Sequence, residues 1–171
     1  MKYVRSIMLA ATAAALASTA SGASAATAAA TPATGRAQIV KGLTLQALTN
    51  LDFGQIVVWG SGTATIDSSG NIVCTTGALA CATTGSAASF KVTGSNGWVV
   101  TVNTPDATLN NTTDPTAAPL TLVMTGQAPT SVTLPNSGTN GTNFNVGGSI
   151  AIPASVKDGV YQGDLNVTVN Y

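Results

Sequence analysis

Residues 161–171 alternate between apolar and polar side chains. One parity holds Tyr161, Gly163, Leu165, Val167, Val169 and Tyr171, and the other holds Gln162, Asp164, Asn166, Thr168 and Asn170. Successive side chains of a β-strand point to opposite faces of its sheet, so this alternation predicts a strand with one buried face. Because a shift of one residue would turn every apolar side chain to water, the register of this strand is expected to be fixed.

The same period of two recurs along most of the chain. Ala37, Ile39, Leu43, Leu45 and Ala47 share one parity, which only Lys41 interrupts. Further predicted strands cover residues 53–59, 63–66, 71–74, 88–93, 98–103, 120–125, 131–134 and 144–152. Turn-forming residues separate these runs, and residues 103–119 are predicted to form a loop. Many short strands without a helical period predict an all-β sandwich or barrel.

Residues 1–25 have the pattern of a secretory signal peptide. Lys2 and Arg5 precede an apolar run at residues 7–17, and Ala23-Ser24-Ala25 supplies small residues for cleavage. The apolar run is shorter than the roughly 20 residues that span a bilayer, and no later stretch is continuously apolar, so no membrane anchor is expected. We therefore predict an exported chain whose mature form begins at Ala26.

The mature chain divides into an extension and one domain. Residues 26–36 consist mostly of Ala and Thr, with Pro32, and are predicted to form an N-terminal extension. Residues 37–171 are long enough for one domain with its own hydrophobic core. We therefore expect a single β-sandwich domain over residues 37–171.

Charged residues are rare in this chain. They make up only 7% of the sequence, whereas an ordinary soluble domain has about a quarter. Acidic residues outnumber basic ones once the signal peptide with Lys2 and Arg5 is removed. Neither nucleic acid nor an anionic membrane is therefore an expected partner.

The two cysteines, Cys74 and Cys81, are predicted to form a disulfide. Export takes the chain to an oxidising compartment, in which a pair of cysteines usually forms a bond. A metal site would need more ligands than two thiols in a chain without histidine, and a redox pair usually has the C-x-x-C spacing. The predicted role of this bond is structural.

No group of residues indicates catalysis. The chain contains six aspartates but no histidine and no glutamate, so a serine or cysteine nucleophile would lack its usual base. No cofactor and no resident metal are expected, and the predicted function is not enzymatic. Oxygen-bearing side chains grouped at residues 67–71 and 110–114 make calcium binding an alternative, but neither group has the order of an EF-hand loop. Sugar binding by Trp59 and Trp98 is a second alternative, although the apolar residues around each tryptophan in the sequence favour packing in the core.

Two motifs resemble those of a known family. The first is Leu51-Asp52-Phe53-Gly54-Gln55-Ile56, and the second is the closing segment Gly159-Val160-Tyr161-Gln162-Gly163-Asp164-Leu165-Asn166-Val167-Thr168-Val169-Asn170-Tyr171. Together they resemble the archaic chaperone–usher pilins of the spore-coat-protein-U type. Residues 62–67, 88–94 and 144–148 are similar to a related, uncharacterised family of exported proteobacterial β-proteins.

The resemblance implies an immunoglobulin-like β-sandwich that lacks its last strand and is completed by a donor strand from another subunit. The implied acceptor groove is formed by Leu165, Val167, Val169 and Tyr171. The implied donor lies in the extension and runs to about residue 40, with Ala33, Gly35, Ala37 and Ile39 on its inserting face. The implied partners are other copies or related subunits, a periplasmic chaperone and an outer-membrane usher.

Two functions therefore follow from the sequence. The first is a structural subunit of a cell-surface fimbria, exported through the periplasm, with a role in adhesion or biofilm formation. The second is a self-contained secreted or surface-layer binding module, in which residues 37–47 pair within their own sheet and loops such as residues 103–119 bind a ligand.

Overall fold

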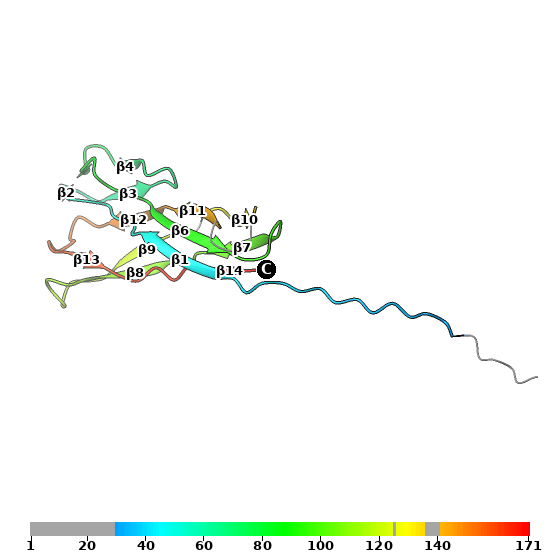
Figure 1. The fold of residues 1–171 in the computed structure, drawn as a ribbon. Helices are drawn as coiled ribbons and strands as arrows, with labels where there is room; N and C mark the ends of the chain where they lie inside the picture. Colours follow the sequence, from blue (N-terminus) through cyan, green and yellow to red (C-terminus); the bar gives the residue numbers. More distant parts are fainter. Residues whose placement is uncertain (1–29, 125, 136–140) are drawn as a thin grey trace, which may run out of the picture. The chain divides into compact units, whose positions relative to one another are not determined.

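The computed structural model describes residues 30–124, 126–135 and 141–171. The predicted signal peptide, residues 1–25, and the first residues of the extension, 26–29, lie outside the described residues. A compact unit spans Gln38–Tyr171, and its described residues form strands, turns and loops (Figure 1). All the strand ladders are antiparallel. The predicted all-β class is confirmed, and the arrangement is consistent with a β-sandwich.

Two of the sheets have three strands each, in the orders β1-β6-β11 and β10-β7-β14. Their strands are β1 (Thr44–Thr49), β6 (Ala88–Thr93), β7 (Val99–Asn103), β10 (Ser131–Thr133), β11 (Thr142–Val146) and β14 (Thr168–Asn170). Strands β6 and β7 are consecutive in the chain but lie in different sheets, so the connection at residues 94–98 crosses between the sheets.

The largest sheet has six strands in the order β13-β8-β9-β12-β3-β4, and a small sheet pairs β2 with β5. Their strands are β2 (Ile56–Val58), β3 (Gly62–Ile66), β4 (Ile72–Cys74), β5 (Leu79–Cys81), β8 (Ala107–Asn111), β9 (Leu120–Val123), β12 (Gly148–Ile152) and β13 (Tyr161–Gln162). In the view of Figure 1, β1 and β6 cross in front of β9 and β12.

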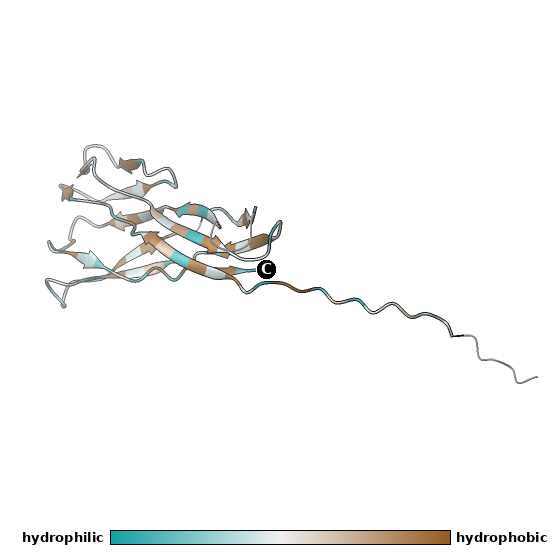
Figure 2. Ribbon diagram, in the orientation of Figure 1, coloured by the Kyte–Doolittle hydropathy of each residue, from teal (hydrophilic) through white to brown (hydrophobic). Residues whose placement is uncertain are grey.

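The alternation of side chains along the strands builds the core. Hydrophobic segments recur with polar ones along β1 and β6 in Figure 2. The rings of Phe90 in β6 and Phe144 in β11 stack, with their centroids 5.7 Å apart. The largest fully buried side chains are Ile66, Leu122, Met124, Leu134, Val92, Val100 and Val146.

The predicted strand at residues 144–152 is wrong, because the chain changes sheet within it. Strand β11 ends at Val146 and pairs with β6, whereas β12 begins at Gly148 and pairs with β3 and β9. Gly147 lies between them, so close to the carbonyl oxygen of Ile66 that a Cβ atom would not fit there. A period of two alone does not reveal such a change of partner.

The predicted strand at residues 161–171 is also divided. Its ends are β13, which pairs with β8, and β14, which pairs with β7, while residues 163–167 belong to no strand. Gly163 passes so close to the Thr108 carbonyl oxygen that a side chain would not fit. Leu165, Val167 and Val169 nevertheless remain half-buried against the core. The alternation therefore describes burial along this segment but not its strand pairing.

The predicted loop at residues 103–119 contains strand β8, so this prediction is wrong. Ala107, Leu109 and Asn111 are buried, and the residues between them are exposed, as expected for a strand at the core. The sequence did not reveal this pattern, since Asn111 is polar and buried positions are usually apolar. Asn111 is buried here because its side-chain amide makes hydrogen bonds to backbone groups. Strand β5 was not predicted either.

The predicted disulfide between Cys74 and Cys81 is confirmed. Cys74 ends β4 at the edge of the six-stranded sheet, and Cys81 ends β5 in the two-stranded sheet, with their Cα atoms 6.1 Å apart. Closing so short a loop stabilises the folded state by about 2–3 kcal/mol in the chain-entropy account. The bond therefore joins two sheets that share no ladder.

The hydroxyl group of Tyr171 joins both ends of the unit. It donates a hydrogen bond to the Lys41 carbonyl oxygen at 2.5 Å and accepts one from the Ser95 amide at 2.8 Å. The Lys41 amide donates in turn to the Ser95 hydroxyl at 2.7 Å, and the Tyr171 ring meets Trp98 edge to face. We call Lys41, Ser95, Trp98 and Tyr171 the Tyr171 cluster.

The variant Tyr171→Phe should lower the free energy of unfolding by about 1–3 kcal/mol, measured by urea denaturation. The phenyl ring still packs against Trp98, but the buried Ser95 amide loses its acceptor. The matched control is Tyr161→Phe, since the Tyr161 hydroxyl donates to the carbonyl oxygen of Lys157 at an exposed site. A control variant that loses as much stability as Tyr171→Phe would contradict the central role of the Tyr171 cluster.

The variant Gly94→Ala should destabilise the fold by about 1–3 kcal/mol, as expected for overpacking. A Cβ atom at Gly94 would lie 2.6 Å from the Tyr171 hydroxyl oxygen, 2.7 Å from Leu43 Cδ2 and 2.9 Å from Leu134 Cδ1. The control is Gly42→Ala, because nothing lies within 4 Å of a Cβ atom there. Thermal unfolding compares the two, and equal melting temperatures would show that Gly94 is not needed for packing.

Candidate functional site

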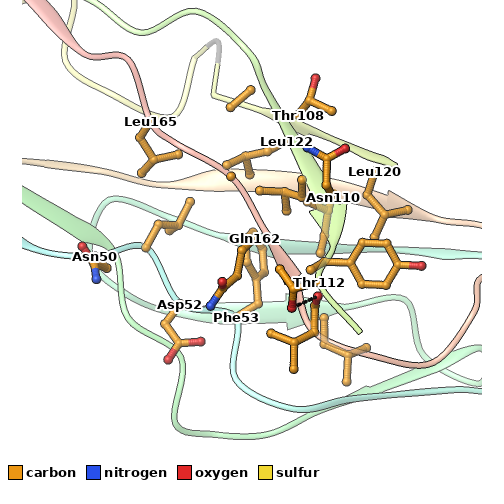
Figure 3. Close-up of a pocket in the computed structure, with 18 of the residues that line it drawn as sticks. Asn50, Asp52, Phe53, Thr108, Asn110, Thr112, Leu120, Leu122, Gln162 and Leu165 are labelled. Atoms are coloured by element: carbon orange, nitrogen blue, oxygen red, sulfur yellow. Dashed lines mark hydrogen bonds between the residues drawn. The ribbon is translucent and has the colours of Figure 1, made fainter. Parts of the chain in front are cut away.

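A groove of about 1940 Å³ runs between two segments of the Gln38–Tyr171 unit. Residues 47–58 form one wall, and residues 156–166 form the other. Strands β8, β9 and β12 supply most of the floor. Figure 3 shows Leu120 and Leu122 of the floor, with Asn50 and Asp52 from the first wall and Leu165 from the second.

The groove presents apolar side chains from its floor and its walls. The floor side chains are buried residues of the core: Leu109, Leu120, Leu122, Ile150 and Ile152. In the walls, Leu51, Ile56, Tyr161 and Leu165 are half-buried against that core. Val160 is 54% exposed on the second wall. An extended peptide with small or branched apolar side chains would therefore find apolar contacts along the groove.

Strand edges flank the groove. Among the described strands, β1 pairs only with β6 and β13 pairs only with β8, and residues of both strands line the groove. Each of the two strands therefore has one edge whose backbone groups have no strand partner. Such an edge favours pairing with another strand, because its N–H and C=O groups are strong hydrogen-bonding groups.

The Tyr171 cluster lies where β1 and β14 approach each other. The chain enters β1 just after Lys41 and leaves β14 at Tyr171, and the hydrogen bond between these residues joins the two edges by a side chain. Figure 1 shows the C-terminus beside the start of β1. The two edge strands thus meet without sharing a ladder.

Hydrogen bonds also order the second wall. The Asn111 amide donates to the Asp158 carbonyl oxygen at 3.0 Å, and its own oxygen accepts from the amides of Thr113 and Asp114. The carbonyl oxygen of Val160 accepts from the amide and hydroxyl of Thr112. The wall near residues 157–160 is therefore attached to the end of β8.

Carboxylates dominate the charge along the groove. Asp52, Asp106, Asp158 and Asp164 line it, with Lys157 as the cation. Lys157 contacts Asp114 at 2.7 Å, and this hydrogen bond, followed by those from Thr116, lowers the pKa of Asp114 to about 2. Since Asp114 balances the charge of Lys157, the groove as a whole is acidic.

The structure separates the four residues of the predicted acceptor set. Leu165 lines the groove, Val167 and Val169 are half-buried against the core further along the chain, and Tyr171 belongs to the Tyr171 cluster. The C-terminal segment still forms one wall of the groove, through residues 156–166 rather than through β14.

The predicted donor residues precede the first strand. Ala33, Gly35, Ala37 and Ile39 have no regular secondary structure, because β1 begins only at Thr44. Ile39 is 91% exposed. Leu45 and Ala47, in contrast, pair with β6. The alternating run that the sequence suggested is thus divided into an unpaired part and a strand of the unit's own sheet.

Sequence reasoning missed the first wall of the groove. Residues 47–58 enter it because β1 contains an irregularity between Ala47 and Thr49, after which the chain leaves β6. Asp52 then accepts a hydrogen bond from the Gly54 amide at 2.8 Å, and Gly54 has a φ of 65°. The motif at residues 51–56 was the available signal, since it marks this sharp change of direction.

The alternative sites from the sequence have structural explanations. Asp67 accepts hydrogen bonds from the amides of Ser69 and Asn71 and from the Asn71 side chain, which lowers the pKa of Asp67. This carboxylate therefore caps a turn. Among the described residues, no cluster of three or more potential ligands could hold a metal ion, and no helix could cross a membrane.

Trp59 does not belong to the core, contrary to the prediction. Its side chain is 69% exposed, and Val57, two residues earlier, is 45% exposed. Val57 and Trp59 are alternate residues on the outward face of β2 and its continuation, while Ile56 and Val58 pack against the core. Trp98 is half-buried and packs against Tyr171.

One of the comparisons with known proteins found a match, and it lies within the compact unit. No curated protein matches the chain, and no solved structure matches it. A family model described as "Domain of unknown function (DUF4402)" matches residues 43–171, from just before β1 to the C-terminus. This match covers most of the sequence and includes both walls of the groove. The chain therefore belongs to the DUF4402 family.

Proposed function

We propose that this protein is a structural subunit of a cell-surface fimbria that assembles by strand exchange, with a role in adhesion or biofilm formation. One observation carries the proposal: a groove with an apolar floor and strand edges along its walls occurs in a chain whose residues 30–43, the described part of the segment before β1, have no strand partner. The extension of one copy would enter the groove of the next copy.

The physical basis is β-augmentation. An extended segment that enters the groove gains main-chain hydrogen bonds at an open strand edge, and its alternate side chains enter apolar pockets. The extension suits this role because Ala33, Gly35, Ala37 and Ile39 are alternate residues, which lie on the same face of an extended segment. Each copy would donate one segment and accept another, so the contact is head to tail and builds an open filament.

The same physics gives the expected partners before assembly. An apolar groove floor beside open strand edges is prone to wrong pairing. We infer that a periplasmic chaperone occupies the groove during export and that an outer-membrane usher receives the subunit. The predicted signal peptide, the disulfide and the scarcity of charge support an extracellular location, because disulfides form in oxidising compartments.

A second candidate function is a self-contained binding module at the cell surface. The exposed Trp59 and Val57 on the outward face of β2 favour it, because an exposed aromatic side chain can contact a ligand. This function would need no donor strand, and β1 already pairs within the unit's own sheet.

The test uses the exported chain, residues 26–171, with a synthetic peptide of residues 26–40. The peptide should raise the melting temperature of the chain, because a ligand that binds only the folded state stabilises it by about 2.7 kcal/mol at a hundred times its dissociation constant. A peptide with Ile39→Asn should bind about 10- to 100-fold more weakly, since it loses a buried isoleucine side chain.

The matched control peptide carries Gln38→Asn, which introduces the same residue type at the opposite parity. It should raise the melting temperature as much as the unchanged peptide. Millimolar unchanged peptide without any thermal shift would exclude strand exchange and leave the binding module.

A further inference from the structure

The acidic groove and the extension have complementary charges. Asp52, Asp106, Asp158 and Asp164 line the groove, and its lysine is paired with Asp114. Between residues 26 and 43 the chain has two charged residues, Arg36 and Lys41, and both are basic. The groove and its expected occupant therefore attract each other before any apolar contact forms.

We propose that the groove accepts residues 33–39 of a second copy in a single register, which is set by a salt bridge from Arg36 of that copy to Asp164. This inference rests on the proposed function, because it specifies how the extension would occupy the groove. Ala37 and Ile39 face the floor in this register. Arg36 has the opposite parity and lies at the mouth of the groove, where the exposed Asp164 stands beside Leu165.

Asp164 is the carboxylate that remains available at the second wall. Asp52 already accepts a hydrogen bond from the Gly54 amide, and Asp106 accepts one from the Met124 amide. Within the described part of the chain, the side chain of Asp164 has no hydrogen-bonding or ionic partner. Asp158, the other carboxylate of this wall, lies in the segment that Asn111 attaches to the end of β8, whereas Asp164 stands beside the apolar side chain of Leu165.

The extension itself excludes neighbouring registers. A shift of one residue would turn Ala37 and Ile39 to water and place Arg36 and Gln38 against the floor. A shift of two residues that moves Lys41 to the place of Ile39 would detach the main chain of Lys41 from Tyr171 and Ser95 of its own copy. The Tyr171 cluster therefore opposes this shift. A shift of two in the other direction would separate Arg36 from Asp164 and withdraw Ile39, the largest apolar side chain of its parity.

The experiment measures binding of fluorescently labelled peptides of residues 30–43 to the exported chain, by fluorescence anisotropy at low and high salt. The unchanged peptide is compared with Arg36→Gln and with a relocated peptide that carries both Thr34→Arg and Arg36→Thr. The relocated peptide has the same net charge as the unchanged peptide, and its arginine lies on the same face of the extended chain. Only the position of the charge along the peptide differs.

The proposal expects both altered peptides to bind about two- to fivefold more weakly at low salt, as for an exposed ion pair. This difference should shrink at high salt, which screens exposed charges. The chain variant Asp164→Asn should bind the unchanged and the relocated peptides equally, because the two have the same net charge, and Asp164→Lys should favour an Arg36→Asp peptide. Melting temperatures of the chain variants check that they fold, and the peptide comparison does not depend on them.

Each remaining outcome overturns a defined part of the interpretation. If the relocated peptide binds as tightly as the unchanged one, Arg36 does not set the register, although strand exchange still stands. If the relocated peptide binds more weakly than the unchanged peptide by the same factor in the wild-type and Asp164→Asn chains, Asp164 is not the partner of Arg36. If the unchanged peptide does not bind at either salt concentration, both the register and the proposed function fail.

Discussion

The hydrogen bonds of the Tyr171 hydroxyl hold the two ends of the folded unit together. Strands β1 and β14 share no ladder, so the contacts of Tyr171 with Lys41 and Ser95 replace the backbone pairing that neighbouring strands would normally provide. Gly94 allows this approach because it has no side chain to displace the hydroxyl. The cluster fixes the distance between the two edges at one point, and the groove lies between the chain segments that continue from them.

The groove keeps its shape because its floor already belongs to the core. Leu122 and Ile150 pack into the same buried cluster as Ile66 and Phe90, so they cannot rise into the groove without leaving a cavity beneath them. The walls are attached separately, the first through its continuation into β2 and the second through the contacts of Asn111 and Thr112. An occupant would therefore meet a largely formed surface, which lowers the entropy that binding must overcome.

Local patterns in the sequence predicted the fold class, the disulfide and most strands, because alternation and turn residues act over a few positions. They did not predict which strands pair. The change of sheet at Gly147 and the division of the C-terminal segment at Gly163 depend on close approaches to distant carbonyl groups. Similarly, the parity of Leu165 predicted its burial and only the family resemblance placed it at a groove, whereas the wall at residues 47–58 depends on where β1 leaves β6. Burial was thus predictable from the period of two, and long-range contacts were not.

The bond between Cys74 and Cys81 has a consequence for the stiffness of the groove. Cys81 pairs with Ile56, a residue of the first wall, so the disulfide connects that wall to the edge of the six-stranded sheet. Before oxidation, the wall relies there on the short ladder between β2 and β5 and on side-chain packing. After oxidation, a covalent link restrains it. The oxidation state of the two cysteines thereby affects how firmly this wall of the groove is held to the rest of the domain.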